Sequence, residues 1–156
     1  MQYTKPKFVW AFLLAYRGNI MKTKHYLTLS DAEFLLNTAY NYALKHGFSV
    51  SIAVVDESGS LLAMKRMDGA SPMTANLCLE KAKCSAISRR PSKLFEDIIK
   101  AGQMGFLTMD SFSGMLEGGE PIMYEGQLVG AMGISGVKSF QDAMIAQQAI
   151  ETFLKQ

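Results

Sequence analysis

A glycine-rich segment near the end of the chain places the tightest constraint on its fold. Residues 118–136 contain six glycines, arranged around two apolar runs. The dipeptide Glu125-Gly126 between the runs is typical of a tight β-hairpin turn, and the second run extends from Gln127 to Ser135. Because this second strand carries almost no side chain on one face, another group must approach its backbone closely. A helix, a neighbouring subunit or a flat ligand would each fit that face.

The chain is long enough for one globular domain with a hydrophobic core. It has 156 residues, of which 49% are apolar and 19% charged. Residues 1–20 carry a charge of +3 and the rest carries −1, so the main body lacks the concentrated basic face that nucleic-acid binding requires. The apolar run from Phe8 to Tyr16 holds nine residues and is too short to span a bilayer. We therefore expect no nucleic-acid or membrane partner, an N-terminal extension over residues 1–20 that is either disordered or not native, and a single domain over residues 21–156.

Hydrophobic periodicity and turn signals predict the element order α-β-β-α-α-β-β-α. This order describes an α+β domain in which helices flank an antiparallel sheet, and it excludes a βαβ nucleotide fold. Capping boxes at Ser30–Glu33 and Ser139–Asp142 are expected to open the first and last helices. The expected helices cover residues 30–46, 72–90, 92–102 and 139–153, the expected strands cover 50–55, 60–67, 121–124 and 127–135, and residues 103–117 are expected to be partly irregular.

The two cysteines indicate a reducing compartment. Cys78 and Cys84 lie six residues apart on one expected helix. That spacing can neither close a disulfide nor supply a usual metal-ligand pair. We expect two small buried side chains and a cytoplasmic protein.

Two groups of residues are candidates for binding an anion. Arg66 and Asp68 lie just before the helix entry Ser71-Pro72, where free amides favour a carboxylate, but a simple turn with an Arg66–Asp68 pair fits equally. Lys81 on the following helix either points inward, where it would hold a propionate or substrate carboxylate, or lies in solvent. Gly133 and Ser135 on the glycine-rich strand complete this set of candidate ligand-binding residues.

The chain has only two histidines, so it offers few residues from which to build a hydrolase triad or a histidine-rich zinc site. His46 lies in the last turn of the first expected helix, where it complements the helix dipole. His25 precedes that helix and is the better candidate for an axial iron ligand, although a surface position fits it too. Five of the eleven methionines, at positions 104, 109, 115, 123 and 132, fall in or near the hairpin half and suit either a core or a flat apolar ligand.

An ordered set of short motifs resembles a known family. The set runs from Ile52–Asp56 through Arg66–Ala70 and Lys81-Ala82 to Gly118–Ile122, Gly130–Gly136 and Gln141-Asp142. Together these motifs resemble the haem-binding or haem-degrading domains of GlcG and HbpS proteins, also found at the C-terminus of PduO-type corrinoid adenosyltransferases. The resemblance covers residues 26–154. It implies a profilin-like fold, a homo-oligomer, and binding of haem or a related small molecule.

Three functions follow as alternatives. The first is an accessory protein that binds haem or a related tetrapyrrole, with propionates held by Arg66 or Lys81. The second, which the resemblance implies, is an enzyme for a small carboxylated or diol-derived metabolite in glycolate, glycerol or diol utilisation, using Arg66, Asp68 and Lys81. The third is an assembly subunit without catalysis of its own. No catalytic residue is assigned by the sequence.

Overall fold

The computed structural model describes residues 21–110 and 112–156, so the expected extension over residues 1–20 lies outside the described residues. A four-stranded antiparallel sheet in the order β2-β1-β4-β3 forms the centre. The predicted α+β class and element order are confirmed. The elements are α2 (Leu29–Lys45), β1 (Ser51–Asp56), β2 (Leu61–Arg66), α3 (Pro72–Ser88), α4 (Lys93–Lys100), the 3₁₀ helix η1 (Met104–Thr108), β3 (Gly119–Tyr124), β4 (Gln127–Ser135) and α5 (Ser139–Leu154).

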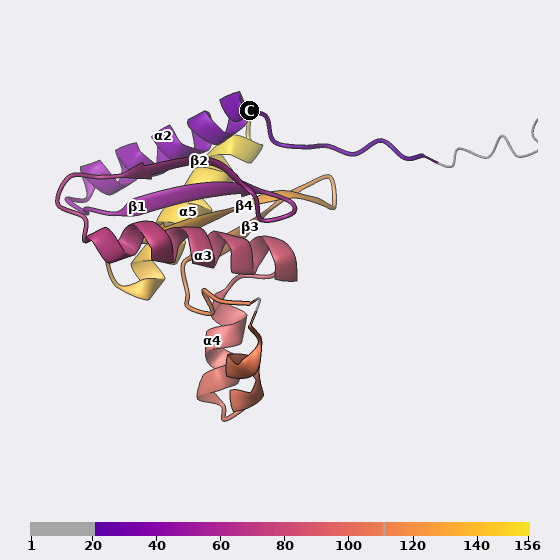
Figure 1. Cartoon of the computed structure of the whole chain (residues 1–156). Helices are drawn as coiled ribbons and strands as arrows, with labels where there is room; N and C mark the ends of the chain where they lie inside the picture. Colours follow the sequence, from indigo (N-terminus) through magenta and orange to yellow (C-terminus); the bar gives the residue numbers. More distant parts are fainter. Residues whose placement is uncertain (1–20, 111) are drawn as a thin grey trace, which may run out of the picture.

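Helices cover both faces of the sheet. Helices α2 and α5 pack side by side on one face, and α3 crosses the other (Figure 1). The α2–α5 side holds the larger apolar core, which includes Leu35, Ile52, Ile134 and Ile145. The α3 side is thinner, since its buried residues are mostly alanine and cysteine. Small side chains bring α3 unusually close to the sheet.

The bare face of the glycine-rich strand is occupied by α3. A Cβ atom added to Gly133 would lie 2.0 Å from the carbonyl oxygen of Cys78 and 2.7 Å from the amide nitrogen of Ala82. These distances are far below van der Waals contact, so a side chain at this position would collide with helix backbone. Of the three partners that the sequence left open, a helix of the same chain fills this face.

Helix boundaries differ from the sequence-based expectation at several caps. The capping box that opens α2 is formed by Thr28 and Asp31 rather than by Ser30 and Glu33. Thr28 is two residues earlier and extended, so its hydroxyl reaches the free amide of Asp31. Helix α3 ends at Ser88 instead of residue 90, because Arg89 adopts a left-handed conformation with φ of 59°.

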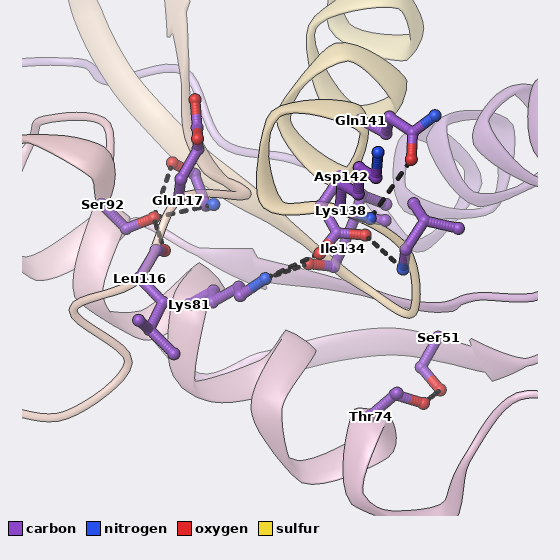
Figure 2. A network of polar contacts seen from close by, with 12 residues as sticks. Ser51, Thr74, Lys81, Ser92, Leu116, Glu117, Ile134, Lys138, Gln141 and Asp142 are labelled. Atoms are coloured by element: carbon purple, nitrogen blue, oxygen red, sulfur yellow. Dashed lines mark hydrogen bonds and ion pairs between the residues drawn. The ribbon is translucent and has the colours of Figure 1, made fainter. Parts of the chain in front are cut away.

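The last helix begins at the expected residue, but Ser139 is not its cap. Lys138 occupies the N-cap position, and its backbone amide donates to the side chain of Gln141 (Figure 2). Both members of the capping pair therefore lie one residue earlier than in the predicted Ser139–Asp142 box. The β3–β4 hairpin agrees closely with the expected ranges, including the two-residue turn.

Residues 93–110 project away from the sheet as an arm that contains α4 and η1 (Figure 1). The ring of Phe95 lies 5.7 Å from that of Phe106 and 4.9 Å from that of Phe112, so the arm has its own small aromatic cluster. Ser92, just before α4, links the start of the arm to the segment that enters β3. Its hydroxyl donates to the carbonyl of Leu116 and accepts from the amide of Gly119 (Figure 2). Within the stretch 103–117, which the sequence predicts to be partly irregular, the described residues contain the 3₁₀ helix η1.

Candidate functional site

A cleft opens where the start of α2 meets the end of α5 and the β3–β4 hairpin. Its volume is about 450 Å³, within the range of roughly 300–1,000 Å³ that is usual for small-molecule sites. Four separate segments of the chain contribute to its walls, so the cleft exists only in the folded domain. Its lining residues are His25, Tyr26, Leu27, Asp31, Tyr124, Val129, Phe153, Leu154 and Gln156.

His25 lies on the wall formed by the segment that leads into α2. Its Nε2 atom is 3.1 Å from Oε2 of Glu125, and its ring meets the ring of Tyr124 edge-on at 4.9 Å. The backbone amide of His25 also lies 3.4 Å from the side-chain oxygen of Gln127. The hairpin turn thus holds a histidine that is 102 residues earlier in the chain than Gln127. The imidazole remains half exposed at the cleft.

The side chains of the cleft suit a ligand that is partly flat and apolar. Tyr26, Tyr124 and Phe153 supply aromatic surface, and His25 supplies one imidazole nitrogen as a candidate ligand for a metal. Within residues 21–110 and 112–156, no group of three or more His, Cys, Asp or Glu side chains is placed to hold a bare metal ion.

Most of the other candidate residues lie at the opposite end of the sheet. Ser51 pairs with Arg66 on one side and with Ser135 on the other, whereas the hairpin turn beside His25 is at the far end of β4. The nine residues of β4 separate these ends by about 26 Å at roughly 3.3 Å per residue. One ligand within one chain therefore cannot contact both His25 and Arg66.

The Arg66–Ala70 segment forms the simple turn that the sequence left as one alternative. Gly69 has a positive φ of 84°, and the amide of Ala70 donates to the carbonyl of Met67. Arg66 and Asp68 are exposed, and the described part of the chain contains no ion pair between them. The turn is present without the charge pair expected to accompany it.

Lys81 points inward, but it faces a carboxylate of its own chain. Its Nζ atom lies 2.9 Å from Oδ2 of Asp142 and 3.0 Å from the carbonyl oxygen of Ile134 (Figure 2). Both charged side chains are about 3% exposed. Burial raises the pKa of Asp142, and the neighbouring Lys81 ammonium opposes that rise. Of the two alternatives that the sequence left open for Lys81, the structure shows the inward one, with the ammonium paired to Asp142.

The sequence analysis used Asp142 in a capping box and in the Gln141-Asp142 motif, and did not single it out as a site residue. It falls on the same helical stripe as Ile145, Ala146 and Ala149, all of which are buried. An acid on an otherwise apolar stripe signals a buried partner. That signal was available in the sequence, although the identity of the partner was not.

Gly133 and Ser135 both lie on the α3 side of β4. The backbone of Gly133 is covered by α3, as described above. Ser135 is 4% exposed and ends the strand beside Ser51. Neither residue lines the cleft around His25.

A second hollow of about 560 Å³ lies on the projecting arm. Met109 and Met115, two of the methionines noted in the sequence, form part of its wall together with Leu107 and Phe112. Met132, in contrast, is fully buried in the main core. The methionines therefore serve both uses that the sequence left open, apolar lining and core.

Glu120 on β3 is a buried acid that the sequence analysis did not single out. It is 7% exposed and accepts a hydrogen bond from Nε2 of Gln147 at 3.2 Å. Burial raises its pKa to about 7, and the hydrogen bond from Gln147 opposes this shift.

The two cysteines are buried, free thiols on α3. Burial raises the pKa of Cys78 and of Cys84 to about 12, so both thiols are unreactive.

The chain matches a family model described as haem-degrading protein HbpS-like over residues 27–151. It is 40% identical to the protein GlcG of Escherichia coli strain K12 over 115 residues, which cover 74% of this chain and 85% of GlcG. Across the described helices, none is long and apolar enough to cross a membrane.

Two solved structures share the fold at similar levels of identity. A double mutant of HbpS from Streptomyces reticuli superposes with a TM-score of 0.75 at 28% identity, covering 87% of this chain and 92% of HbpS. A complex of PduOC with haem gives a TM-score of 0.71 at 26% identity, covering 81% of this chain and 94% of PduOC. A domain of this fold is thus known in complex with haem.

Proposed function

Because the chain belongs to the HbpS-like family, we propose that it is an accessory protein that binds haem or a related tetrapyrrole in the cleft beside His25. The observation that carries this proposal is the position of the imidazole. Of the two histidines, His25 is the one that lines a cleft with aromatic walls. It is therefore the residue to serve as an axial ligand to iron.

The residues of the cleft fit a tetrapyrrole in three respects. The volume is adequate, the Tyr26, Tyr124 and Phe153 rings offer apolar contact, and a single nitrogen ligand suffices for a metal already held by a macrocycle. A bound haem supplies redox chemistry, while the protein supplies binding and orientation. The PduOC complex supports this assignment, since it shows haem on a related domain.

We further propose that the protein is a homo-oligomer of the cytoplasm. Tyr26 and Leu154 line the cleft and are 68% and 40% exposed. A second protomer over this edge would bury both and enclose the ligand. An enzyme built on Arg66, Asp68 and Lys81 has less support, because the Lys81 ammonium is paired with Asp142.

A haem titration tests the proposal. Hemin added to the purified protein should shift its Soret band at low micromolar concentration. His25→Ala should weaken binding at least about tenfold, since one metal bond is lost, whereas His46→Ala should behave as the parent protein. His46 is the matched control because its ring stacks on Tyr42 at the end of α2 and is not part of the cleft.

The outcomes separate the two parts of the proposal. No Soret shift with the parent protein would overturn haem binding. Equal affinities and equal spectra for the parent protein and His25→Ala would overturn the assignment of His25 as the iron ligand.

A further inference from the structure

The projecting arm presents an apolar surface that the described part of the chain does not cover. Helix α4 has apolar and charged residues at amphipathic spacing, yet none of its residues is buried. Three large apolar side chains, Leu107, Met109 and Leu116, are 57%, 48% and 43% exposed, and all three line the hollow of about 560 Å³. Exposed apolar side chains gathered in one place mark an interaction site.

Contacts at the base of the arm fix the walls of this hollow. The carboxylate of Glu96 on α4 accepts from the backbone amide of Glu117 at 2.7 Å, and it pairs with Lys100. The buried hydroxyl of Ser92 donates to the carbonyl of Leu116. Because α4 is joined in this way to the segment that returns to β3, the hollow between them is part of the fold.

Residues 1–20, which lie outside the described residues, contain a segment that complements the hollow. The run from Phe8 to Tyr16 is apolar throughout, and residues 1–20 carry a charge of +3 with no acid. Residues 93–117 hold two lysines and four acids, a charge of −2. The wall of the hollow carries Glu96 and Asp110 as well as Lys100. An apolar run with basic flanks therefore suits this hollow in both polarity and charge.

The connection between the run and the domain is long enough for contact with the arm. Ten positions separate Arg17 from Leu27, where the chain enters the core. At roughly 3.3 Å per residue this connection spans up to about 33 Å. A domain of this size has a radius of gyration of about 14 Å. The run can thus reach the arm of its own chain or that of a neighbouring copy.

We propose that the run from Phe8 to Tyr16 docks in the hollow between α4 and residues 107–116. The arm is then the receptor for the N-terminal segment of this protein. The apolar side chains of the run cover Leu107, Met109 and Leu116, and its basic flanks lie near the acids of the arm. This inference goes beyond the proposed function and does not depend on haem binding.

The fluorescence of Trp10 tests the docking in the full-length, ligand-free protein. Trp10 is the only tryptophan of the chain and lies within the run. Its emission should lie at shorter wavelength, and be quenched less by acrylamide, than that of a peptide of residues 1–20. Leu107→Ser should weaken docking about tenfold or more, because it removes the contribution of a buried leucine side chain. The emission of Trp10 should then move to longer wavelength. Met109→Ser repeats the test at a second exposed position of the wall.

Met73→Ser is the matched control for the apolar contact. Met73 is 68% exposed on α3 and is not part of the wall, so the Trp10 signal should equal that of the parent protein. Asp110→Asn tests the charge contribution and should weaken docking about two- to fivefold at low salt. Asp97→Asn, an acid of α4 outside the wall, should have a smaller effect. Circular dichroism checks that each variant keeps its helices.

The outcomes decide the proposal. Emission and quenching of Trp10 equal to those of the peptide would overturn docking. Equal protection of Trp10 in the parent protein, Leu107→Ser and Met109→Ser would overturn the arm as the receptor. A loss in Met73→Ser as large as that in Leu107→Ser would overturn it as well. Equal effects of Asp110→Asn and Asp97→Asn would overturn the contribution of charge at the wall.

Discussion

The Nζ atom of Lys81 lies 2.9 Å from Oδ2 of Asp142, although 61 residues separate them and both side chains are about 3% exposed. This pair joins α3 to the first turn of α5. Oδ1 of Asp142 also accepts from the amide of Val137, and Lys81 donates to the carbonyl of Ile134. The pair thus links α3, on one face of the sheet, to α5, on the other face, at the end of β4.

Lys81→Met should destabilise the domain by about 3–5 kcal/mol, because it leaves the Asp142 carboxylate buried without a counter-charge. Urea unfolding measures the loss. Lys83→Met is the matched control on the same helix: Lys83 is more exposed and, among the described residues, pairs with Glu80, so the change should stay within about 1 kcal/mol. The double variant Lys81→Met, Asp142→Asn should recover part of the loss. Equal losses in Lys81→Met and Lys83→Met would contradict the structural role of the buried pair.

Glu120 should make the protein less stable as the pH rises through neutrality. Its pKa is about 7 in the folded protein, against an ordinary value of 4.5. Below pH 4.5 both the folded and the unfolded chain hold the proton on Glu120, so the full contribution of this residue to the free energy of unfolding is present. Between pH 4.5 and pH 7 the unfolded chain releases its proton first, so the free energy of unfolding falls, by about 3 kcal/mol.

Glu120→Gln should remove this slope, because glutamine still accepts from Gln147 and carries no charge. Chemical unfolding at several pH values between 4 and 8 measures the effect. Glu33→Gln, on an exposed position of α2, should keep the slope of the parent protein. A slope that persists unchanged in Glu120→Gln would show that another group causes it.

Gly133→Val should cost more than about 3 kcal/mol, because its side chain would meet the backbone of α3. Thermal unfolding and size-exclusion chromatography measure stability and assembly. Gly105→Val is the control, since a Cβ atom at Gly105 meets nothing within 4 Å and its φ is not in the left-handed range. An unchanged melting temperature for Gly133→Val would refute the close approach of α3.

Removal of residues 1–20 should leave a folded domain. The described apolar core begins at Leu27, and the capping box of α2 begins at Thr28. Circular dichroism and a cooperative thermal transition of the shortened protein provide the measurement. Insoluble or non-cooperative material would show that the extension is needed for folding.

Local patterns predicted the fold because each depends on residues close in sequence. The hairpin turn at Glu125-Gly126 was identifiable from turn chemistry, which acts within a few residues. The caps were less certain, since Thr28 and Ser30 both suit an N-cap and only the backbone conformation distinguishes them.

The site was much less predictable. Arg66, Lys81 and His25 were all reasonable candidates by residue type, yet Arg66 and His25 lie at opposite ends of the sheet and Lys81 is paired. The contacts that decide the site join residues far apart in the chain. Lys81 and Asp142 are 61 positions apart, and His25 and Gln127 are 102 positions apart. No local pattern encodes such distances.

The sequence by itself determined the α+β order, the tight hairpin and the need for close approach to its bare strand, because periodicity and glycine content act locally. Only the tertiary structure decided that α3 makes this approach, that Asp142 neutralises Lys81, and that Glu125 holds His25. The physical reason is that these contacts arise when the layers pack, and packing selects one partner among several that the sequence allows.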